Sequence, residues 1–276
     1  MSETASAPGP LGRVQRLLGR ELRTIARTRT YLLLTVALAA VLLGIALTGS
    51  ASAGYVPTVV DLLTPLELLV PIVAVAFGYR AIVADESRGE LDVLATYPVT
   101  AREHVLGVYA GRAVGLMVAI ATPMVAVGAA VALRREEPVE IYATTAGADS
   151  PILFARFVVL TLAFALVVLA IALAISALAG GTRNVLVLAI IGLIVLLVGL
   201  DLVLVFGLSV GYLPESVLLE AIAISPLSAY RGLVFETVIA TAAGTGPETA
   251  SVPASLLGLA IWLVGSLAVA TWALRR

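Results

Sequence analysis

Long apolar stretches separated by short polar segments dominate the chain. Six of them reach the length of about 20 mainly apolar residues that a helix needs to cross a bilayer. They cover residues 31–49, 62–82, 106–133, 152–178, 185–208 and 254–274. The prolines and glycines inside them are tolerated in a membrane, where neighbouring helices satisfy the freed backbone groups. The pattern predicts an all-α polytopic membrane protein with six transmembrane helices, in which residues 11–276 form a single transmembrane domain.

The segment before the first apolar stretch has a different periodicity. Within residues 11–29, Arg side chains and aliphatic side chains each recur every three or four positions, which places them on opposite faces of one helix. This pattern is typical of an N-terminal amphipathic helix that lies in the membrane interface beside anionic lipid headgroups. Arg residues that only orient the chain would explain their number but not their spacing. Residues 1–10 are mostly small or polar, with two prolines, and predict a disordered tail.

Composition agrees with a membrane location. The 276 residues are 61% hydrophobic and 13% charged, whereas soluble domains average about 45–50% and 25%. All 17 basic residues are Arg. If the N-terminus lies in the cytoplasm, only Arg134, Arg135, Arg156 and Arg231 fall on the opposite side. Because basic residues remain on the cytoplasmic side, we expect both termini to be cytoplasmic in a prokaryotic cell membrane.

The cytoplasmic segment between the second and third stretches concentrates charge. Residues 85–92 contain five charged side chains beside aliphatic ones, and Pro98 follows shortly after. We predict a short amphipathic helix from about Ala84 to Ala95, with acids in its first turn where they complement the helix dipole. Such a helix can dock on a partner, and a solvated loop is the alternative.

The order of these elements resembles that of the permease subunits of type-2 ABC transporters. The charged segment fits the form E-x-x-G-x-L-x-x-L-x-x-x-P of their coupling helix. The sequences FARF around Arg156, DLVL from Asp201 and SPLSAYR ending at Arg231 resemble, in the same order, segments of the NosY-like permeases of nitrous-oxide-reductase maturation. On this resemblance, the coupling-helix residues are Asp85, Glu86, Arg88, Gly89, Leu91, Leu94 and Pro98.

The resemblance implies a non-enzymatic membrane subunit of an ATP-driven exporter. ATP and Mg²⁺ would be bound by a separate cytoplasmic ATPase, and no cofactor is expected in this chain. The chain has no Lys, which a P-loop of the form G-x-x-x-x-G-K-[ST] requires. The resemblance further implies a homodimer in contact with membrane lipids and a link to copper-enzyme maturation, and it allows an extracytoplasmic substrate-handling protein as a partner. No nucleic-acid partner is expected, and without Cys and with one His we predict no metal site.

Ionisable residues inside the predicted spans are functional candidates because each costs free energy in a membrane. We place Glu67, Arg156 and Asp201 in the outer third of the membrane. Arg156 and Asp201 are expected to pair, with contact to the substrate as the alternative, and Glu67 could instead reach the surface. Arg231 lies in the external segment 209–253, whose two apolar parts, 217–224 and 227–243, predict short helices that dip into the outer leaflet or cap the cavity of the dimer. A full pair of further spans is the alternative.

Small and polar residues mark the start of the third span. Gly107, Gly111 and Gly115 recur every fourth residue and predict a groove for close helix packing, either between two copies or within one. His104 is expected to be a surface histidine at the membrane edge.

Two other functional classes compete with the exporter. One is an ion-coupled secondary transporter that uses Glu67 and Asp201, although acids near the outer surface do not fit a midplane site. The other is a non-transporting membrane anchor of an assembly.

Overall fold

The computed structural model describes residues 10–84, 100–135, 149–179, 181–212, 214, 217–244 and 248–275, and these residues form helices and turns without a strand. Six helices are long and apolar enough to cross a membrane, as the sequence predicted. They are α2 (Arg29–Thr48), α3 (Tyr55–Gly78), α6 (Ala101–Arg134), α7 (Pro151–Leu178), the continuous helix α8–η1–α9 (Thr182–Ile194, Val195–Gly199, Leu200–Ser209) and α13 (Val252–Ala273).

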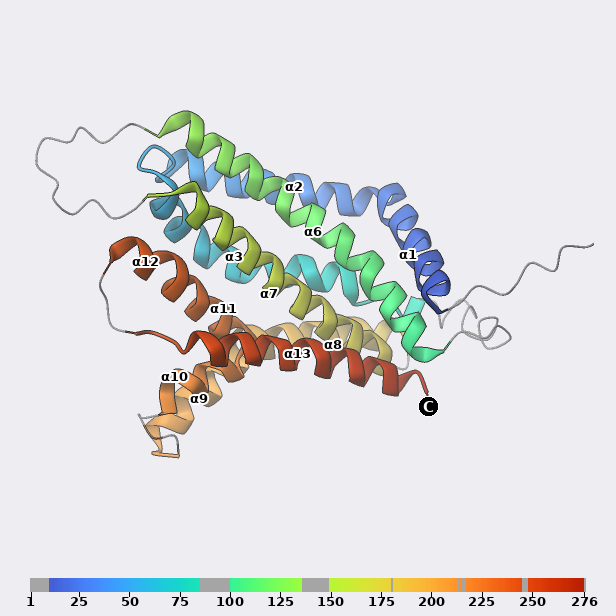
Figure 1. The fold of residues 1–276 in the computed structure, drawn as a ribbon. Coiled ribbons are helices and arrows are strands. Elements are labelled where there is room, and N and C mark those ends of the chain that lie inside the picture. Colours follow the sequence, from blue (N-terminus) through green and yellow to red (C-terminus); the bar gives the residue numbers. More distant parts are fainter. Residues whose placement is uncertain are drawn as a thin grey trace, which may run out of the picture.

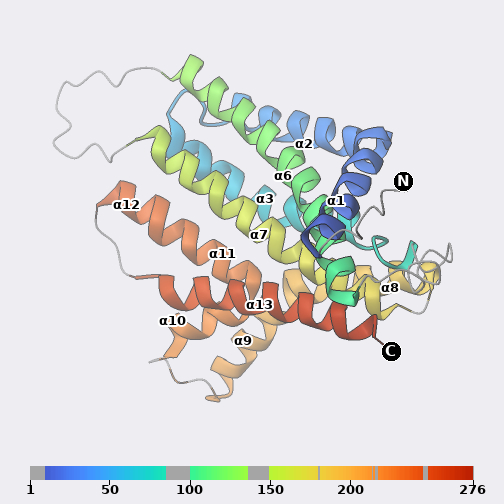
Figure 2. The same ribbon diagram turned by 45° about the vertical axis from the view of Figure 1, so that its right-hand side comes forward.

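These six helices run side by side along one long axis, with successive spans in opposite directions (Figure 1). Helix α1 (Pro10–Arg27), the start of α8 and the C-terminal end of α13 therefore share one end of the bundle, called here the α1 end (Figure 2). The loop between α2 and α3 and the start of α13 lie at the opposite end. Because six spans lie between them, α1 and the C-terminal end of α13 lie at the same end of the bundle.

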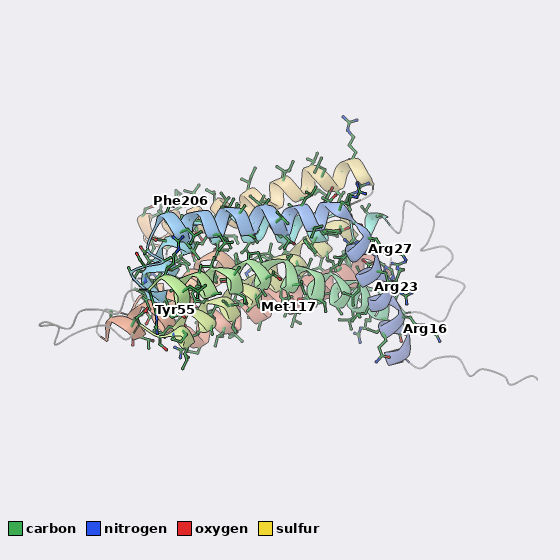
Figure 3. The ribbon with its side chains drawn as sticks, turned by 90° about the horizontal axis from the view of Figure 1, so that it is seen from above. Arg16, Arg23, Arg27, Tyr55, Met117 and Phe206 are labelled. Carbon is green, nitrogen blue, oxygen red and sulfur yellow. The ribbon has the colours of Figure 1, made fainter. Side chains whose placement is uncertain are left out.

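Helix α1 is the amphipathic helix that the sequence predicted, and it turns away from α2 at Thr28 (Figure 3). The labelled side chains of Arg16, Arg23 and Arg27 lie on it, at the end of the bundle opposite Tyr55. Its other face packs along the first third of α6. The expected location in the membrane interface stays a prediction.

Carboxylates anchor the turn between α2 and α3. Asp61 accepts a hydrogen bond from the backbone N–H of Ser50 (2.9 Å), and Asp149, just before α7, accepts one from the N–H of Val56 in the first turn of α3 (2.8 Å). Gly54 lies between these contacts with φ of +122° and directly faces the Asp149 carboxylate, so a side chain there would both strain the backbone and clash. Helix α3 consequently begins at Tyr55, seven residues before the predicted span.

The external segment 209–253 folds back into the bundle. One arm comprises α10 (Leu218–Ala221) and η3 (Ile222–Ile224), and the other is a continuous helix of α11 (Pro226–Val234), η4 (Phe235–Ile239) and α12 (Ala240–Ala243). The turn between the arms accepts a hydrogen bond from Trp262 Nε1 at the carbonyl of Ile224 (2.9 Å). Trp262 lies ten residues into α13, about 15 Å along it at 1.5 Å per residue. The predicted short helices are therefore present, as a hairpin that reaches about halfway down α13.

The two π-helical turns, η1 and η4, interrupt otherwise regular helices. The span formed by α8 and α9 changes direction at η1 (Figure 1), as expected where an extra residue enters a helical turn. Pro65 and Pro71 in α3 and Pro123 in α6 lie inside continuous helices, as membrane packing allows.

Candidate functional site

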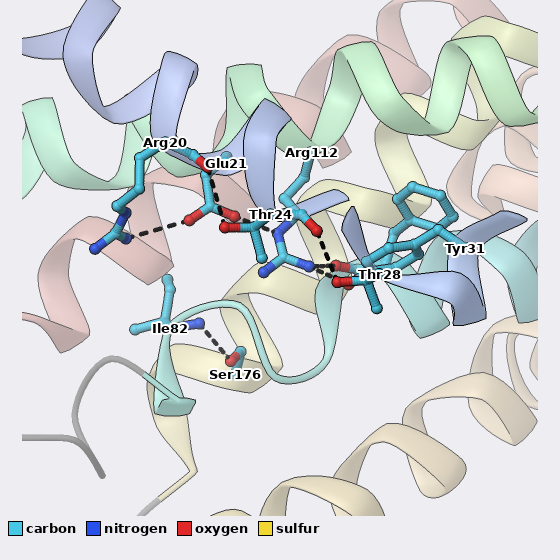
Figure 4. A network of polar contacts seen from close by, with 9 residues as sticks. Arg20, Glu21, Thr24, Thr28, Tyr31, Ile82, Arg112 and Ser176 are labelled. Carbon is cyan, nitrogen blue, oxygen red and sulfur yellow. Dashed lines mark hydrogen bonds and ion pairs between the residues drawn. The ribbon is translucent and has the colours of Figure 1, made fainter. Parts of the chain in front are cut away.

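A buried Arg joins four elements at the α1 end of the bundle. Arg112 on α6 donates from Nε to Glu21 Oε2 of α1 (2.6 Å) and from Nη1 to the Phe77 carbonyl of α3 (3.1 Å). Its Nη1 also donates to the Tyr31 hydroxyl at the start of α2. The side chains of Arg112 and Glu21 are only 12% and 5% exposed. These groups are called the Arg112 junction, and Figure 4 shows Glu21 and Tyr31 on either side of Arg112.

The three glycines of α6, Gly107, Gly111 and Gly115, form the surface against which α1 packs. A Cβ placed on Gly107 would lie 2.6 Å from Leu17 Cβ, and one placed on Gly115 would lie 2.7 Å from Ile25 Cδ1. A Cβ on Gly111, between them, would overlap the side chain of Glu21. Residues 17, 21 and 25 repeat every fourth position as the glycines do, so the two helices run parallel and in register. Of the two expected uses of the stripe, the structure shows packing within one chain.

The charged segment predicted as a coupling helix lies between two anchored ends. The Ser176 hydroxyl of α7 accepts hydrogen bonds from the N–H groups of Ile82 and Val83, both at 3.1 Å, just before the segment. After it, Thr100 and Glu103 form a capping box at the start of α6. The coupling-helix candidates themselves, Asp85, Glu86, Arg88, Gly89, Leu91, Leu94 and Pro98, lie outside the described residues.

A second polar cluster lies inside the bundle, between α3, α9 and α11. Arg231 binds Glu67 in a bidentate ion pair, with Nε–Oε1 and Nη2–Oε2 distances of 2.6 Å. One turn earlier on α11, the Ser228 hydroxyl donates to Asp201 Oδ1 of α9 (2.8 Å). These four residues are called the Arg231 cluster. It places one guanidinium between two acidic spans, a pairing that relieves the cost of charge in a low dielectric.

The expected pair of Arg156 with Asp201 is wrong. Arg156 on α7 donates to the Thr237 carbonyl, which lies in the π-helical turn η4. A π turn leaves carbonyls without their usual helical donors, and Arg156 satisfies one of them. Asp201 meets the hairpin through Ser228 instead.

Glu67 lies further from the start of its helix than the predicted span placed it, and its depth in the membrane stays a prediction. Because α3 begins at Tyr55, Glu67 lies twelve residues into a 24-residue helix, about 18 Å along it and so near its middle. Its side chain is 7% exposed and does not reach the surface. The hairpin carries Arg231 inward to meet it.

His104 is buried rather than at the surface, with 3% of the residue exposed. It lies one helical turn before Gly107 and therefore on the face of α6 that packs against α1. The prediction of a surface position failed because the sequence pattern of α1 does not show that it packs along α6.

A shallow pocket of about 280 Å³ opens beside the Arg231 cluster. It is lined by Ile222, Ser228, Arg231, Gly232, Phe235 and Thr249. The Arg231 side chain is 45% exposed here while Glu67 holds two of its nitrogens. The remaining nitrogen can bind an anionic group in the pocket, so the cluster can serve both packing and ligand contact.

Three of the polar side chains that join helices, Glu21, Tyr230 and Ser176, were not predicted from the sequence. Glu21 interrupts the aliphatic stripe of α1 between Leu18 and Ile25, and a carboxylate in an apolar stripe signals a buried partner. The hydroxyl of Tyr230 lies 2.9 Å from Thr161 Oγ1, and its ring stacks on Phe164 at 4.7 Å. Ser176 gave no comparable signal, because a small hydroxyl in an apolar helix most often bonds its own backbone.

Comparison with known proteins gives a consistent result across the chain. A family model described as ABC-2 family transporter protein matches residues 15–276. A probable ABC transporter permease protein NosY of Pseudomonas aeruginosa is 33% identical over 270 residues, which cover 93% of this chain and 96% of the relative. A probable NosY permease of Stutzerimonas stutzeri is 30% identical over 117 residues, which cover 40% of this chain and 42% of that relative.

Proposed function

Since the chain belongs to the ABC-2 family of transporter proteins and is a multi-pass permease of a prokaryotic cell membrane, we propose that it couples ATP hydrolysis by a separate subunit to export. The family implies the partner ATPase. We further propose that the segment between α3 and α6, residues 85–99, docks on that ATPase, with the α1 end of the bundle facing the cytoplasm.

The Arg112 junction is the observation that supports this coupling. The docking segment begins eight residues after Phe77, and α6, which follows it, begins eleven residues before Arg112. Arg112 binds groups of α1, α2 and α3 at once. A displacement of the segment would therefore move three spans and the amphipathic helix together rather than bend one loop.

The substrate side of the proposal rests on the Arg231 cluster. It lies between α3, α9 and α11, beside a pocket and next to two π-helical turns, which are frequent at functional sites. Two copies of the chain would enclose the transport path, and an extracytoplasmic protein would receive or deliver the substrate at the opposite end. A role in copper-enzyme maturation follows from the NosY relatives and is part of the proposal.

The proposal is tested by reconstituting the chain with its ATPase in lipid nanodiscs. We expect Glu86→Arg to abolish co-purification of the ATPase, because it reverses charge on the docking segment. Tyr31→Phe removes one hydroxyl of the Arg112 junction and keeps the ring. We expect this variant to retain the ATPase and to lose part of the permease-dependent change in ATP hydrolysis.

Arg183→Gln is the matched control, because Arg183 is exposed at the same end of the bundle and belongs to neither feature. It should behave as the wild type in both measurements. Wild-type binding and hydrolysis in both test variants would contradict the proposed coupling route.

A further inference from the structure

A polar pocket of about 610 Å³ lies at the α1 end, between the α1–α2 bend and the end of α3. Its polar rim includes Thr24, Thr28, Tyr79, Arg80 and Arg112, and its apolar wall includes Leu34 and Ala76. Among the lining residues that the structure describes there are two Arg and no acid. The pocket therefore has a net positive lining and favours an anion.

Arg80 is the side chain best placed to receive that anion. It is exposed, and it has no ion pair or side-chain hydrogen bond with any residue in the described ranges. Arg112 also lines the pocket, and its Nε and Nη1 are held by Glu21, Tyr31 and Phe77. Its Nη2 has no partner within the described part of the chain. Two guanidinium groups with free donors can chelate the oxygens of one phosphate group.

The pocket changes from polar to apolar along α2. Thr30 lies at its rim, and Leu34, one turn further along α2, lies on its apolar wall. Leu33, on the adjoining face of α2, is 67% exposed toward the surface of the bundle. A ligand with a charged head and an apolar tail fits this gradient, whereas a free anion would use only the rim.

The pocket is also continuous with the basic face of α1. Thr24 lines both this pocket and a neighbouring groove of about 470 Å³. That groove is lined by Arg16, Arg20, Arg23 and Arg27 together with Gln15, Gly19 and Thr24. Basic residues at a membrane surface attract anionic lipids, so the α1 face would concentrate such lipids beside the pocket.

We propose that this pocket is a binding site for a phosphate group, carried by an anionic phospholipid whose headgroup sits between Arg80 and Arg112. The occupied site would tie the α1–α2 bend to the end of α3. Its location on the cytoplasmic leaflet follows from the orientation proposed above. Binding itself requires neither nucleotide nor the ATPase, so a failure here leaves the proposed function untouched.

Lipid retention measured by native mass spectrometry of the purified full chain tests the site. The probes are phosphatidylglycerol and, as the neutral reference, phosphatidylcholine. We expect Arg80→Gln to weaken phosphatidylglycerol binding about tenfold, because it removes charge-assisted hydrogen bonds to the phosphate group. Ala76→Leu fills the apolar wall without changing charge and should weaken the same lipid, with phosphatidylcholine binding unchanged in both variants.

Arg183→Gln is the control for loss of one exposed Arg at this end, and it should retain phosphatidylglycerol as the wild type does. A parallel titration with glycerol phosphate and inorganic phosphate distinguishes the source of the group. Soluble phosphate binding that depends on Arg80 but not on Ala76 would support the anion site and assign it to a free phosphate. Phosphatidylglycerol binding that is equal in wild type, Arg80→Gln and Ala76→Leu, or reduced equally by Arg183→Gln, would overturn the proposal.

Discussion

At the scale of single residues, the fold depends on charges that are neutralised inside the bundle. The Glu67 carboxylate receives two hydrogen bonds from Arg231, and the Glu21 carboxylate receives one from Arg112. Each pair joins helices that are far apart in sequence. Because an ion left alone in a low dielectric is strongly unfavourable, each acid fixes the position of the helix that carries its partner.

The Glu67–Arg231 pair should show energetic coupling in a double-mutant cycle. We expect Glu67→Leu and Arg231→Met each to destabilise the protein, by less than the about 3–5 kcal/mol of a fully buried pair because Arg231 is partly exposed. The double variant should lose less than the sum of the two. Thermal unfolding in detergent measures this.

Arg156→Met and Asp201→Leu provide the matched control cycle. The wild-type Arg156 and Asp201 are both charged, but they bind different groups. Their effects should be additive within about 0.5 kcal/mol. Additive losses for Glu67 and Arg231, or strong coupling between Arg156 and Asp201, would contradict the pairing described above.

At the scale of elements, α1 can contact α6 closely because three positions of α6 are glycines without side chains. Three glycines at every fourth position let the backbone of α6 approach Leu17, Glu21 and Ile25. This close approach brings the Glu21 carboxylate within reach of Arg112. Packing of α1 and the Arg112 junction are thus one structural feature.

Gly111→Ala should therefore destabilise the protein, by about 1–3 kcal/mol as for other overpacked contacts. Its new methyl group would overlap the Glu21 side chain. Gly44→Ala in α2 is the control, since no atom lies within 4 Å of the added methyl. That change should be neutral or stabilising by about 0.5–1 kcal/mol, because alanine favours helices. Equal melting temperatures for the two variants would argue against close packing of α1 on α6.

The hairpin has a pH-sensitive attachment to the residues just before α13. The backbone N–H and the hydroxyl of Thr249 donate to Glu236, and these hydrogen bonds lower the pKa of the Glu236 carboxyl below its ordinary range. A lowered pKa means that the attachment stabilises the fold at neutral pH and is lost as the pH falls through that pKa. We expect the difference in melting temperature between wild type and Glu236→Gln to be present at pH 7 and to disappear in acid. A difference that stays constant with pH would contradict this role.

At the scale of the whole molecule, the helices could be predicted from the sequence, but the partners of the charged residues could not. Apolar length and helical spacing predicted six spans, an amphipathic α1 and two helical stretches in 209–253, because these depend on local pattern. Depth and partners depend on where distant segments meet. The start of α3 is fixed by Asp149, which accepts a hydrogen bond from the N–H of Val56, 93 residues away, and this earlier start places Glu67 near the middle of α3. The pairing of Arg231 likewise required the hairpin to fold inward.

The orientation of the bundle is the last prediction, and the absence of native Cys makes it directly measurable. We expect single cysteines at Tyr212 and Glu248, both exposed at the end opposite α1, to react with a membrane-impermeant maleimide on intact cells. A cysteine at Arg183 should react only after the membrane is permeabilised, because it lies at the α1 end. The reverse pattern would place the α1 end outside, contrary to the distribution of Arg.

A cysteine at Ile224, on the hairpin turn, tests whether the protein has six spans or eight. The turn reaches only about halfway along α13, so labelling of Ile224 from the cytoplasmic side alone would show that the two arms span the membrane and that the protein crosses it eight times.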